Sequence, residues 1–284
     1  MTSDSATDPS SPLRRLGYAG PLLDVDAIEW HDGRATRRRT TVVEETPAVI
    51  VYNRVPHVVM MATPADLEDF VLGFSLTEEL ITSPDQLLDV SVERFSLGIE
   101  IKATIAPERD AVIAERARQM GGRTGCGICG ANDLQGVLKT LHPVVPGRPL
   151  TADVVHAAFE ELTGQQELNR QAGAVHAAGW ASRDGHIVLV REDVGRHNAL
   201  DKLVGAAITR GVDPADGFVV VTSRASFEMV QKATVLGAPL LAAISGPTGL
   251  AVRVAQEAGM TLVGFARRNR LTAYTHPARL VAHG

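Results

Sequence analysis

The stretch that decides the fold is Phe218-Val219-Val220-Val221-Thr222, an unbroken apolar run rich in β-branched residues. Such a run is typical of a strand that is buried on both faces of a sheet. Two more apolar runs follow, at Pro239–Ile244 and Thr261–Phe265, and helical patterns at Phe227–Leu236 and Leu250–Ala258 separate the three runs. Strands that alternate with helices predict an α/β domain with a mainly parallel sheet covered on both faces.

The segment before this series adds elements to the same domain. Apolar spacing predicts a helix from Arg196 to Arg210, and a turn at Asp184-Gly185 joins two short apolar strands into a hairpin. The domain is expected to begin with a helix that Thr151 caps. Its connector, His142–Pro149, contains three prolines. The hairpin strands are expected at Ala174–Ala181 and His186–Arg191, and the capped helix is expected to end near Leu162.

The N-terminal part has a different pattern, in which short strands predominate. We expect a helix over Pro64–Ile81, with Thr63 as its N-cap and Pro64 in its first turn. A β-hairpin is predicted to turn at Leu97-Gly98. These features predict α+β structure with antiparallel pairing. The other expected elements are strands at Thr36–Val43, Ala48–Tyr52, His57–Met61, Ser91–Phe95 and Ile99–Ile105, and a helix at Glu108–Met120.

Together the patterns predict an α/β protein (α+β overall) with a larger, mainly parallel domain and a smaller N-terminal domain. The start of the chain is polar and contains proline, with no apolar core of a signal peptide, so we expect it to be disordered. The predicted segments are a disordered tail at 1–12, an N-terminal α+β part at 13–120, a mobile cysteine loop at 121–130, a connector at 131–150 and an α/β domain at 151–284.

Composition narrows the possible classes of function. The 284-residue chain is 45% hydrophobic and 21% charged, which is ordinary for a soluble protein. A formal net charge of −5 and an aromatic content of 4% do not favour a nucleic-acid partner. No apolar run approaches the roughly 20 residues that are needed to span a bilayer. We therefore expect a cytoplasmic protein with no membrane span and no nucleic-acid partner.

Both cysteines lie in one glycine-rich stretch, Gly121–Gly130, as a Cys126-x-x-Cys129 pair. Glycine suits an open loop that presents thiols, and Arg123 would favour the reactive thiolate. Three chemistries remain open, namely a zinc site, a thioredoxin-type redox site and a sulfur carrier. Structural zinc needs four ligands, so His142 or a second copy would have to contribute. A redox pair is expected near the start of a βαβ unit, and the pattern therefore favours sulfur transfer.

Polar residues crowd three points where a predicted strand ends and a helix begins. In open α/β sheets, ligands collect at the carboxyl ends of strands, and helix N-termini favour anions. The alternative is that these residues only cap helices or form solvated faces. We favour a site for an anionic ligand of nucleotide size. The candidate binding residues are Asp193, Arg196, His197, Asn198, Ser223, Arg224, Ser226, Ser245, Gly246 and Thr248.

A fourth candidate segment, Phe265-Ala266-Arg267-Arg268-Asn269-Arg270, follows the last predicted parallel strand. Guanidinium groups make bidentate contacts to phosphate, so this turn suits a phosphate ligand. A solvated basic turn is an equally good explanation. His176 lies in an apolar strand and is expected to be a core histidine. His276 is too close to the end of the chain to be given a role.

Six stretches in a fixed order carry a family resemblance. They are Gly125–Gly130, Gly173–Ala178, Glu192–Lys202, Ser223–Met229, Ser245–Thr248 and Tyr274–Pro277. In sequence and order these stretches resemble the FdhD family, the accessory sulfurtransferases of formate dehydrogenase.

This resemblance implies a sulfurtransferase that matures a molybdenum enzyme. Such proteins take persulfide sulfur from a cysteine desulfurase and pass it to the molybdenum cofactor, Mo-bis(molybdopterin guanine dinucleotide), before its insertion into formate dehydrogenase. It implies that Cys126 holds the persulfide and Cys129 assists it, and that Phe265–Arg270 contacts the guanine nucleotide end of the cofactor. It also implies a homodimer, with the 151–284 domain binding the cofactor as a substrate and no permanent metal.

The larger domain of the FdhD family is related to cytidine deaminases, and this relationship raises a zinc enzyme as an alternative. Those enzymes combine His-x-Glu with Pro-Cys-x-x-Cys. Here Ala178 stands where the glutamate is expected, and Gly125 precedes Cys126. Deamination is therefore disfavoured. A cofactor-binding chaperone without sulfur transfer and a redox protein remain as alternatives.

Overall fold

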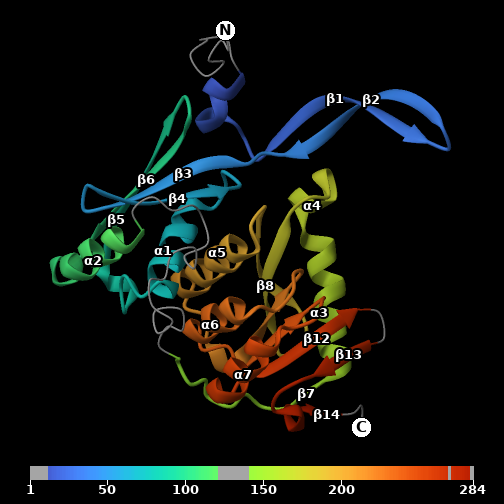
Figure 1. The fold of residues 1–284 in the computed structure, drawn as a ribbon. Coiled ribbons are helices and arrows are strands. Elements are labelled where there is room, and N and C mark those ends of the chain that lie inside the picture. The colour runs from blue at the N-terminus through green and yellow to red at the C-terminus, as the bar shows by residue number, and fades with distance from the viewer. Residues whose placement is uncertain (1–11, 121–140, 268–269, 282–284) are drawn as a thin grey trace.

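The computed structural model describes residues 12–120, 141–267 and 270–281 of the chain. A sheet with helices on both faces forms the lower part of Figure 1, and a smaller sheet lies above it. A long two-stranded ribbon projects beside the smaller sheet. No helix in these ranges is both long enough and apolar enough to cross a membrane.

The larger sheet has six strands in the order β13-β12-β11-β10-β8-β9. The strands β10, β11 and β12 run parallel, as the alternating pattern predicts. The other three pairings are antiparallel, so the expectation of a mainly parallel sheet is wrong. The antiparallel pair β8–β9 follows the predicted turn at Asp184-Gly185, which returns the chain in the opposite direction. The strands are β8 (His176–Ser182), β9 (Ile187–Asp193), β10 (Gly217–Val221), β11 (Leu240–Ala243), β12 (Thr261–Arg267) and β13 (Arg270–Ala273).

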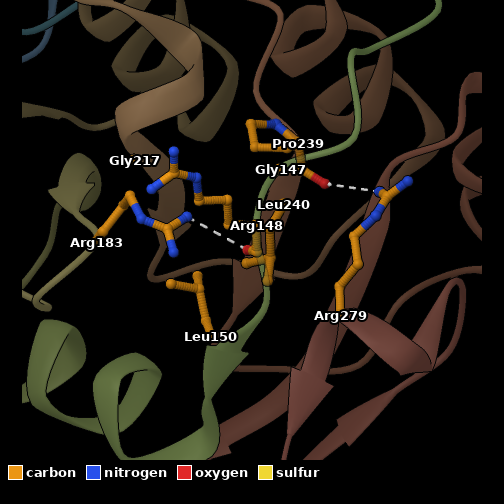
Figure 2. A pocket seen from close by; sticks show the side chains of 8 residues that line it. All are labelled: Gly147, Arg148, Leu150, Arg183, Gly217, Pro239, Leu240 and Arg279. Atoms are coloured by element: carbon orange, nitrogen blue, oxygen red, sulfur yellow. Dashed lines mark hydrogen bonds between the residues drawn. The ribbon is translucent and has the colours of Figure 1, made fainter.

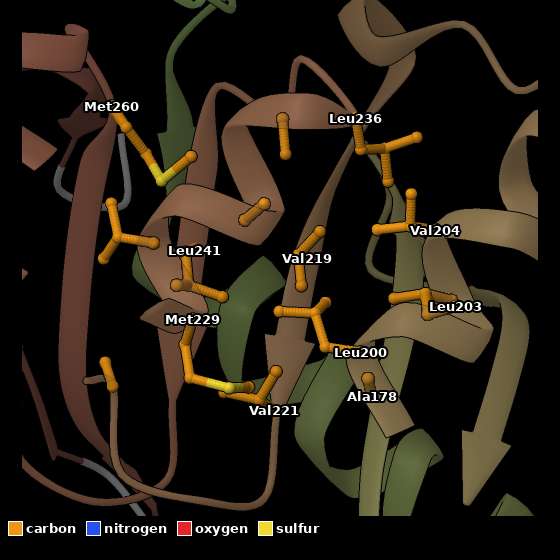
Figure 3. Packing of buried hydrophobic residues seen from close by; sticks show 14 of the residues in the cluster. Ala178, Leu200, Leu203, Val204, Val219, Val221, Met229, Leu236, Leu241 and Met260 are labelled. Carbon is orange, nitrogen blue, oxygen red and sulfur yellow. The ribbon is translucent and has the colours of Figure 1, made fainter. Parts of the chain in front are cut away.

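Both faces of this sheet are covered by helices, because the side chains of its central strands alternate between two apolar clusters. Val219 and Val221 of β10 pack against helices α5, α6 and α7 (Figure 3). Phe218 and Val220 face the opposite way, toward α3. This double burial explains the continuous apolar run. The helices are α3 (Ala152–Gln165), α5 (Arg196–Thr209), α6 (Phe227–Val235) and α7 (Gly249–Ala258), with a short α4 (Glu167–Ala172) before β8.

The smaller sheet has the order β4-β3-β6-β5 and packs against helix α1. The expected hairpin of β5 and β6 is confirmed. The expectation of antiparallel pairing is wrong for β3 and β6, which pair parallel at the centre of the sheet. The strands are β3 (Thr46–Tyr52), β4 (Val55–Ala62), β5 (Leu87–Phe95) and β6 (Gly98–Ile105), and the helices are α1 (Leu67–Thr77) and α2 (Asp110–Met120). Short elements complete the description: η2 (Pro12–Tyr18), η3 (Pro84–Gln86), η4 (Pro107–Arg109), β7 (Leu150–Thr151), η6 (Pro214–Asp216), η7 (Pro277–Arg279) and β14 (Leu280–Val281).

The projecting ribbon consists of β1 (Leu22–His31) and β2 (Arg34–Val43), paired antiparallel along their whole length. Sequence patterning predicts most of β2 but not β1, and it does not predict that the two strands form a separate ribbon. Trp30 on β1 is 72% exposed. The cross-strand ion pair Arg38–Glu29 is 2.8 Å long and exposed. Because both faces of the ribbon meet solvent for most of their length, β1 lacks the apolar stripe that normally reveals a strand.

Helix α1 begins at Leu67 rather than at Pro64, and Thr63 is not its N-cap. Asp66 occupies the cap position with a left-handed backbone, φ 52°. Thr63 is fully buried, and its backbone N–H donates to Asp193 Oδ2 at 3.0 Å. Its hydroxyl accepts from the backbone N–H of Val194 at 3.2 Å. Thr63 therefore bonds to Asp193 and Val194, which are distant in sequence, and does not cap the helix as the local pattern predicts.

Helices α1 and α5 cross in direct backbone contact, and this crossing joins the two parts of the chain. A Cβ atom on Gly73 would overlap the carbonyl oxygen of Asp201. A Cβ atom on Gly205 would overlap the carbonyl oxygen of Asp69. The side chain of Asp69 also pairs with Arg191 of β9, with an Nε–Oδ2 distance of 2.8 Å. Glycine is required at both points because any side chain would push the helices apart.

Two buried charge networks lie on either side of this crossing. In the first, Lys202 Nζ is 2.7 Å from Asp193 Oδ2 and donates to Thr63 O at 3.0 Å. In the second, Lys232 Nζ lies 2.8 Å from Asp201 Oδ1 and donates to Thr77 Oγ1 at 2.9 Å. Burial opposes the charge of Lys232, but Asp201 and Glu78 together raise its pKa to about 12. Each network connects α5 to the segment around α1.

His57 gives the fold a pH dependence. The ring is 7% exposed, stands edge-on to Tyr52 at a centroid distance of 5.2 Å, and has no hydrogen-bond partner among the described residues. Burial lowers its pKa to about 4. The unfolded chain, with a histidine pKa near 6.5, therefore binds a proton that the folded protein excludes. Stability should fall by up to about 3 kcal/mol as the pH falls from about 6.5 to 4.

Urea denaturation at pH 7 and pH 4.5 measures this loss, and His57→Phe is the matched variant because it keeps a ring against Tyr52. The variant should lose less stability between the two pH values. Some dependence should remain, since burial also lowers the pKa of His176. An equal loss in both proteins would show that His57 is not responsible.

Candidate functional site

The predicted binding turns all lie on one edge of the six-stranded sheet. Strands β10, β11 and β12 are parallel, so their carboxyl ends meet at the same edge. The antiparallel register places Ala178 of β8 opposite Val221 and His176 opposite Asp193. The start of β8 and the end of β9 therefore lie on this edge too, and we call it the carboxyl edge. The N-termini of α5, α6 and α7 lie at the same edge, because each helix follows one of these strand ends.

Asp193 and Asn198 form the buried support of the first turn. Asp193 is fully buried, and its Oδ1 accepts from the backbone N–H of Gly195 at 2.8 Å and from Asn198 Nδ2 at 2.9 Å. Asn198 is 3% exposed and also donates to the carbonyl oxygen of Met61 at 2.8 Å. Both side chains are thus occupied by contacts within the protein. These contacts hold the turn in place. They partly support the alternative that Asp193 and Asn198 organise the start of the helix.

Three buried polar atoms beside this turn lack a hydrogen-bond partner among the described residues: Arg196 Nε, His197 Nε2 and Ser226 Oγ. They belong to the first turn of α5 and the cap position of α6. His197 Nε2 lies 3.1 Å from Glu228 Oε2, which is an ion-pair distance without hydrogen-bond geometry. Unsatisfied buried donors cost about 1–3 kcal/mol each, so a ligand that accepts from them would be favoured.

His176 belongs to the same edge and is not the core histidine expected from its apolar neighbours. It is half-buried at the start of β8. Burial lowers its pKa, and the charges of Arg196 and His197 act in the same direction. Asp193 partly opposes them. Burial is the main cause of this shift, and the nearby Arg196 is the cation that would favour an anion here.

The second and third turns pack against each other. The backbone N–H of Thr248 donates to the carbonyl oxygen of Ala225 at 3.0 Å. Thr248 Oγ1 accepts from the backbone N–H of Ala251 at 3.2 Å, so Thr248 is an N-cap. Ser226 occupies the cap position of α6 but makes no capping bond. In the turn before α6, Ser223 is buried and its hydroxyl donates to the carbonyl oxygen of Arg224. The side chain of Arg224 is exposed.

The end of β12 lies beside the turn after β11. Phe265 has a left-handed backbone, φ 52°, which is unusual for a bulky residue. Its N–H donates to the carbonyl oxygen of Ser245 at 3.2 Å, and a Cβ on Gly246 would come within 2.8 Å of its ring. The Arg270 guanidinium lies over this ring, 5.8 Å from the centroid. The turn after β11 and the end of β12 are thus in contact, and Arg267 and Arg270 are exposed.

The structure brings most of the predicted site residues together, but it does not give them equal exposure. Ala266 is fully buried in the cluster on the α3 face, away from any ligand surface. Cys126, Cys129, Arg268 and Asn269 lie outside the described residues. The sequence predicts Thr63 as a helix cap and His176 as a core residue, and it gives no role to Glu228. The sequence does contain a signal for Glu228. It lies in the first turn of a predicted helix, two residues after the candidate Ser226.

These observations define an α/β protein with a mixed sheet and a polar carboxyl edge. The edge combines three helix N-termini with Arg196, Arg224, Arg267 and Arg270, so its groups suit an anionic ligand. The unpartnered Arg196 and Ser226 atoms fit phosphate oxygens. The groups present therefore fit the phosphate-bearing part of a guanine dinucleotide cofactor.

The chain belongs to the FdhD/NarQ family, whose model matches residues 43–281. It is 48% identical to the sulfur carrier protein FdhD of Cupriavidus necator over 251 residues, which cover 88% of this chain and 87% of that protein. It is also 48% identical to the sulfur carrier protein FdhD of Xanthomonas axonopodis pv. citri over 275 residues, 96% of each chain. The crystal structure of a candidate formate dehydrogenase accessory protein from Desulfotalea psychrophila has the same fold, with a TM-score of 0.72 and 22% identity, over 92% of this chain and 99% of that one.

Proposed function

We propose that this protein is a sulfur carrier that serves formate dehydrogenase by delivering sulfur to its molybdenum cofactor. One observation carries the proposal: relatives that bear the name sulfur carrier protein FdhD are 48% identical over as much as 96% of the chain. The Cys126-x-x-Cys129 pair supplies the sulfur chemistry, and the carboxyl edge supplies groups for an anionic acceptor.

The carrier step is a thiolate exchange without net oxidation. The Cys126 thiolate attacks the outer sulfur of a persulfide on a cysteine desulfurase. A new sulfur–sulfur bond forms at Cys126, the sulfur–sulfur bond of the donor breaks, and the donor leaves as a thiolate. Cys129, three residues later in the sequence, is the second thiol, and the family resemblance implies that it assists this step. The accepting substrate is the molybdenum of the bis(guanine dinucleotide) cofactor.

The carboxyl edge holds this cofactor through its phosphates and its guanine end. Arg267 and Arg270 contact phosphate, and Arg196, His197 and Ser226 donate to it from the helix N-termini. Asp193 and Asn198 act through their neighbours by fixing the turn that carries Arg196. The remaining candidates, Ser223, Arg224, Ser245, Gly246 and Thr248, shape the two adjoining turns. The domain division at 13–120 and 151–284 belongs to the same proposal, with the second part as the cofactor-binding one.

Two matched variants test the two halves of this proposal. Cys126→Ala should gain no sulfur in intact-mass analysis after incubation with a desulfurase and cysteine, yet should bind GDP as the wild type does. Arg270→Gln should gain sulfur normally but bind GDP at least tenfold more weakly in calorimetry. The same mass measurement on Cys129→Ala shows whether the second thiol is needed for the gain of sulfur. If Cys126→Ala gains one sulfur atom and Cys129→Ala gains none, the carrier assignment is wrong.

The alternatives predict different outcomes. A chaperone that only binds the cofactor would restore formate dehydrogenase activity in cells lacking this protein, even as a Cys126→Ala, Cys129→Ala double variant. A redox protein would form a stable Cys126–Cys129 disulfide that a reductase reopens, and thiol titration would detect the cycle.

A further inference from the structure

A second basic cavity lies at the opposite edge of the six-stranded sheet, where the parallel strands begin. Gly217 opens β10 and Leu240 opens β11, and both line this cavity (Figure 2). Arg148 and Arg183 lie on one side of it and Arg279 on the other (Figure 2). They come from the connector, the β8–β9 turn and η7, so three separate segments each bring an arginine to the lining of this cavity. The carboxyl edge lies at the far ends of the same strands.

Among the described residues, no carboxylate lines this cavity, and none of the three arginines forms an ion pair. Arg183 donates instead to the carbonyl oxygens of Arg148 and Pro149, each at 3.3 Å. Arg279 donates to the carbonyl oxygen of Gly259 at 2.5 Å. Carbonyl groups orient a guanidinium but do not neutralise its charge. Burial lowers the pKa of Arg279, because it disfavours the charged form of the guanidinium. A nearby anion would stabilise that charged form.

The walls of the cavity are fixed by glycine and proline. A Cβ on Gly147 would lie 2.9 Å from Pro239, and one on Gly217 would lie 2.6 Å from the Trp180 ring. The cavity is about 10 Å³ in volume. That volume holds about one water molecule, or one oxygen of an oxyanion. A whole nucleotide cannot enter, but a phosphate group can place one oxygen inside and leave the others outside.

We propose that this cavity binds a phosphate group through Arg148, Arg183 and Arg279. A phosphate matches the site because it carries up to two negative charges and several acceptor oxygens, and guanidinium groups bind such oxygens in bidentate fashion. The group can be free inorganic phosphate or the terminal phosphate of a larger molecule that stays outside. The cavity is separate from the carboxyl edge, so the proposal stands whether or not the protein carries sulfur.

Calorimetric titration of the full chain with inorganic phosphate and with GMP tests this proposal. The wild type should bind at least one of the two probes. Arg148→Gln should weaken that binding at least tenfold, because it removes an exposed guanidinium whose loss breaks no hydrogen bond among the described residues. Arg183→Gln should weaken it as much or more. Tighter binding of phosphate than of GMP indicates the free ion as ligand, and the reverse indicates a phosphate ester.

One matched control separates this cavity from other positive charges. Arg210→Gln removes an exposed charge just after the end of α5 and should retain binding within about twofold of the wild type. If Arg183→Gln does not fold, Arg148→Gln decides the question. Absence of binding to both probes, or unchanged binding in Arg148→Gln, would each overturn the proposal.

Discussion

We expect the substitution Lys202→Met to lower the free energy of unfolding by about 3–5 kcal/mol, because it leaves a buried carboxylate without its counter-charge. Lys202 and Asp193 both have fully buried side chains, 2.7 Å apart. Methionine keeps most of the lysine volume, so the loss reports on charge rather than on a cavity. The lost Nζ also bonds Thr63 O at 3.0 Å, so the junction between α5 and the segment before α1 should loosen. Urea denaturation at pH 7 measures the change.

Two further variants show whether charge is the cause. Lys102→Met makes the same substitution in the Lys102–Glu93 pair, whose side chains are 43% and 48% exposed, and should change stability little. Combining Lys202→Met with Asp193→Asn removes both charges and should recover part of the lost stability. A double variant that is no more stable than Lys202→Met alone would mean that packing at the junction, and not the unpaired charge, dominates.

Replacing Gly205 by alanine should destabilise the protein by about 3 kcal/mol or more, because the new methyl group must occupy space that backbone already fills. A Cβ at this position overlaps the carbonyl of Asp69 on α1. A main-chain carbonyl in a helix cannot rotate away, so the two helices must separate. Separation would also strain the Arg191–Asp69 contact across the same junction. Thermal or urea denaturation of the full chain measures the loss.

Gly164→Ala is the matched control, since Gly164 lies in α3 and a Cβ atom added there would meet no other atom within 4 Å. At this position alanine should stabilise the helix by roughly 0.5–1 kcal/mol. The same chemical change should therefore have opposite signs at the two sites. Gly73→Ala, on the other side of the crossing, should behave like Gly205→Ala. Equal and small effects at Gly205 and Gly164 would show that the helices can adjust without loss.

The α/β pattern is predictable from the sequence because each central strand is buried on both faces and is therefore continuously apolar. Strand partners are not predictable in the same way. Nothing local in β8 tells that it pairs antiparallel with β10, since pairing depends on the arrangement of whole elements. The β1 strand was missed for a physical reason: it carries charges and is exposed along most of its length, so it has neither a helical nor a clear strand periodicity. Thr63 does not cap the helix because its hydroxyl instead accepts from the backbone N–H of Val194.

The location of the candidate site follows from the sequence better than the roles of its residues. Turns that follow parallel strands must meet at one edge, so the convergence of Ser226, Thr248 and Arg270 could be expected. The burial of individual residues at this edge could not be expected, because it depends on contacts with the N-terminal part of the chain. Asn198, for instance, is occupied by the carbonyl oxygen of Met61, which is 137 residues away in sequence. For His176 the sequence predicted too much burial. Its strand is apolar, but the strand begins at the solvent-facing edge of the sheet.

The neighbouring positions of Asp201 and Lys202 on α5 have a consequence for how this sequence can change. The two residues point about 100° apart around the helix, so each reaches a different partner. Asp201 meets Lys232, and Lys202 meets Asp193. Insertion or deletion of one residue before them would rotate both side chains away from their partners and break both pairs at once. Length variation among related chains should therefore be absent between Asp193 and Lys202, while the tip of the β1–β2 ribbon can tolerate it.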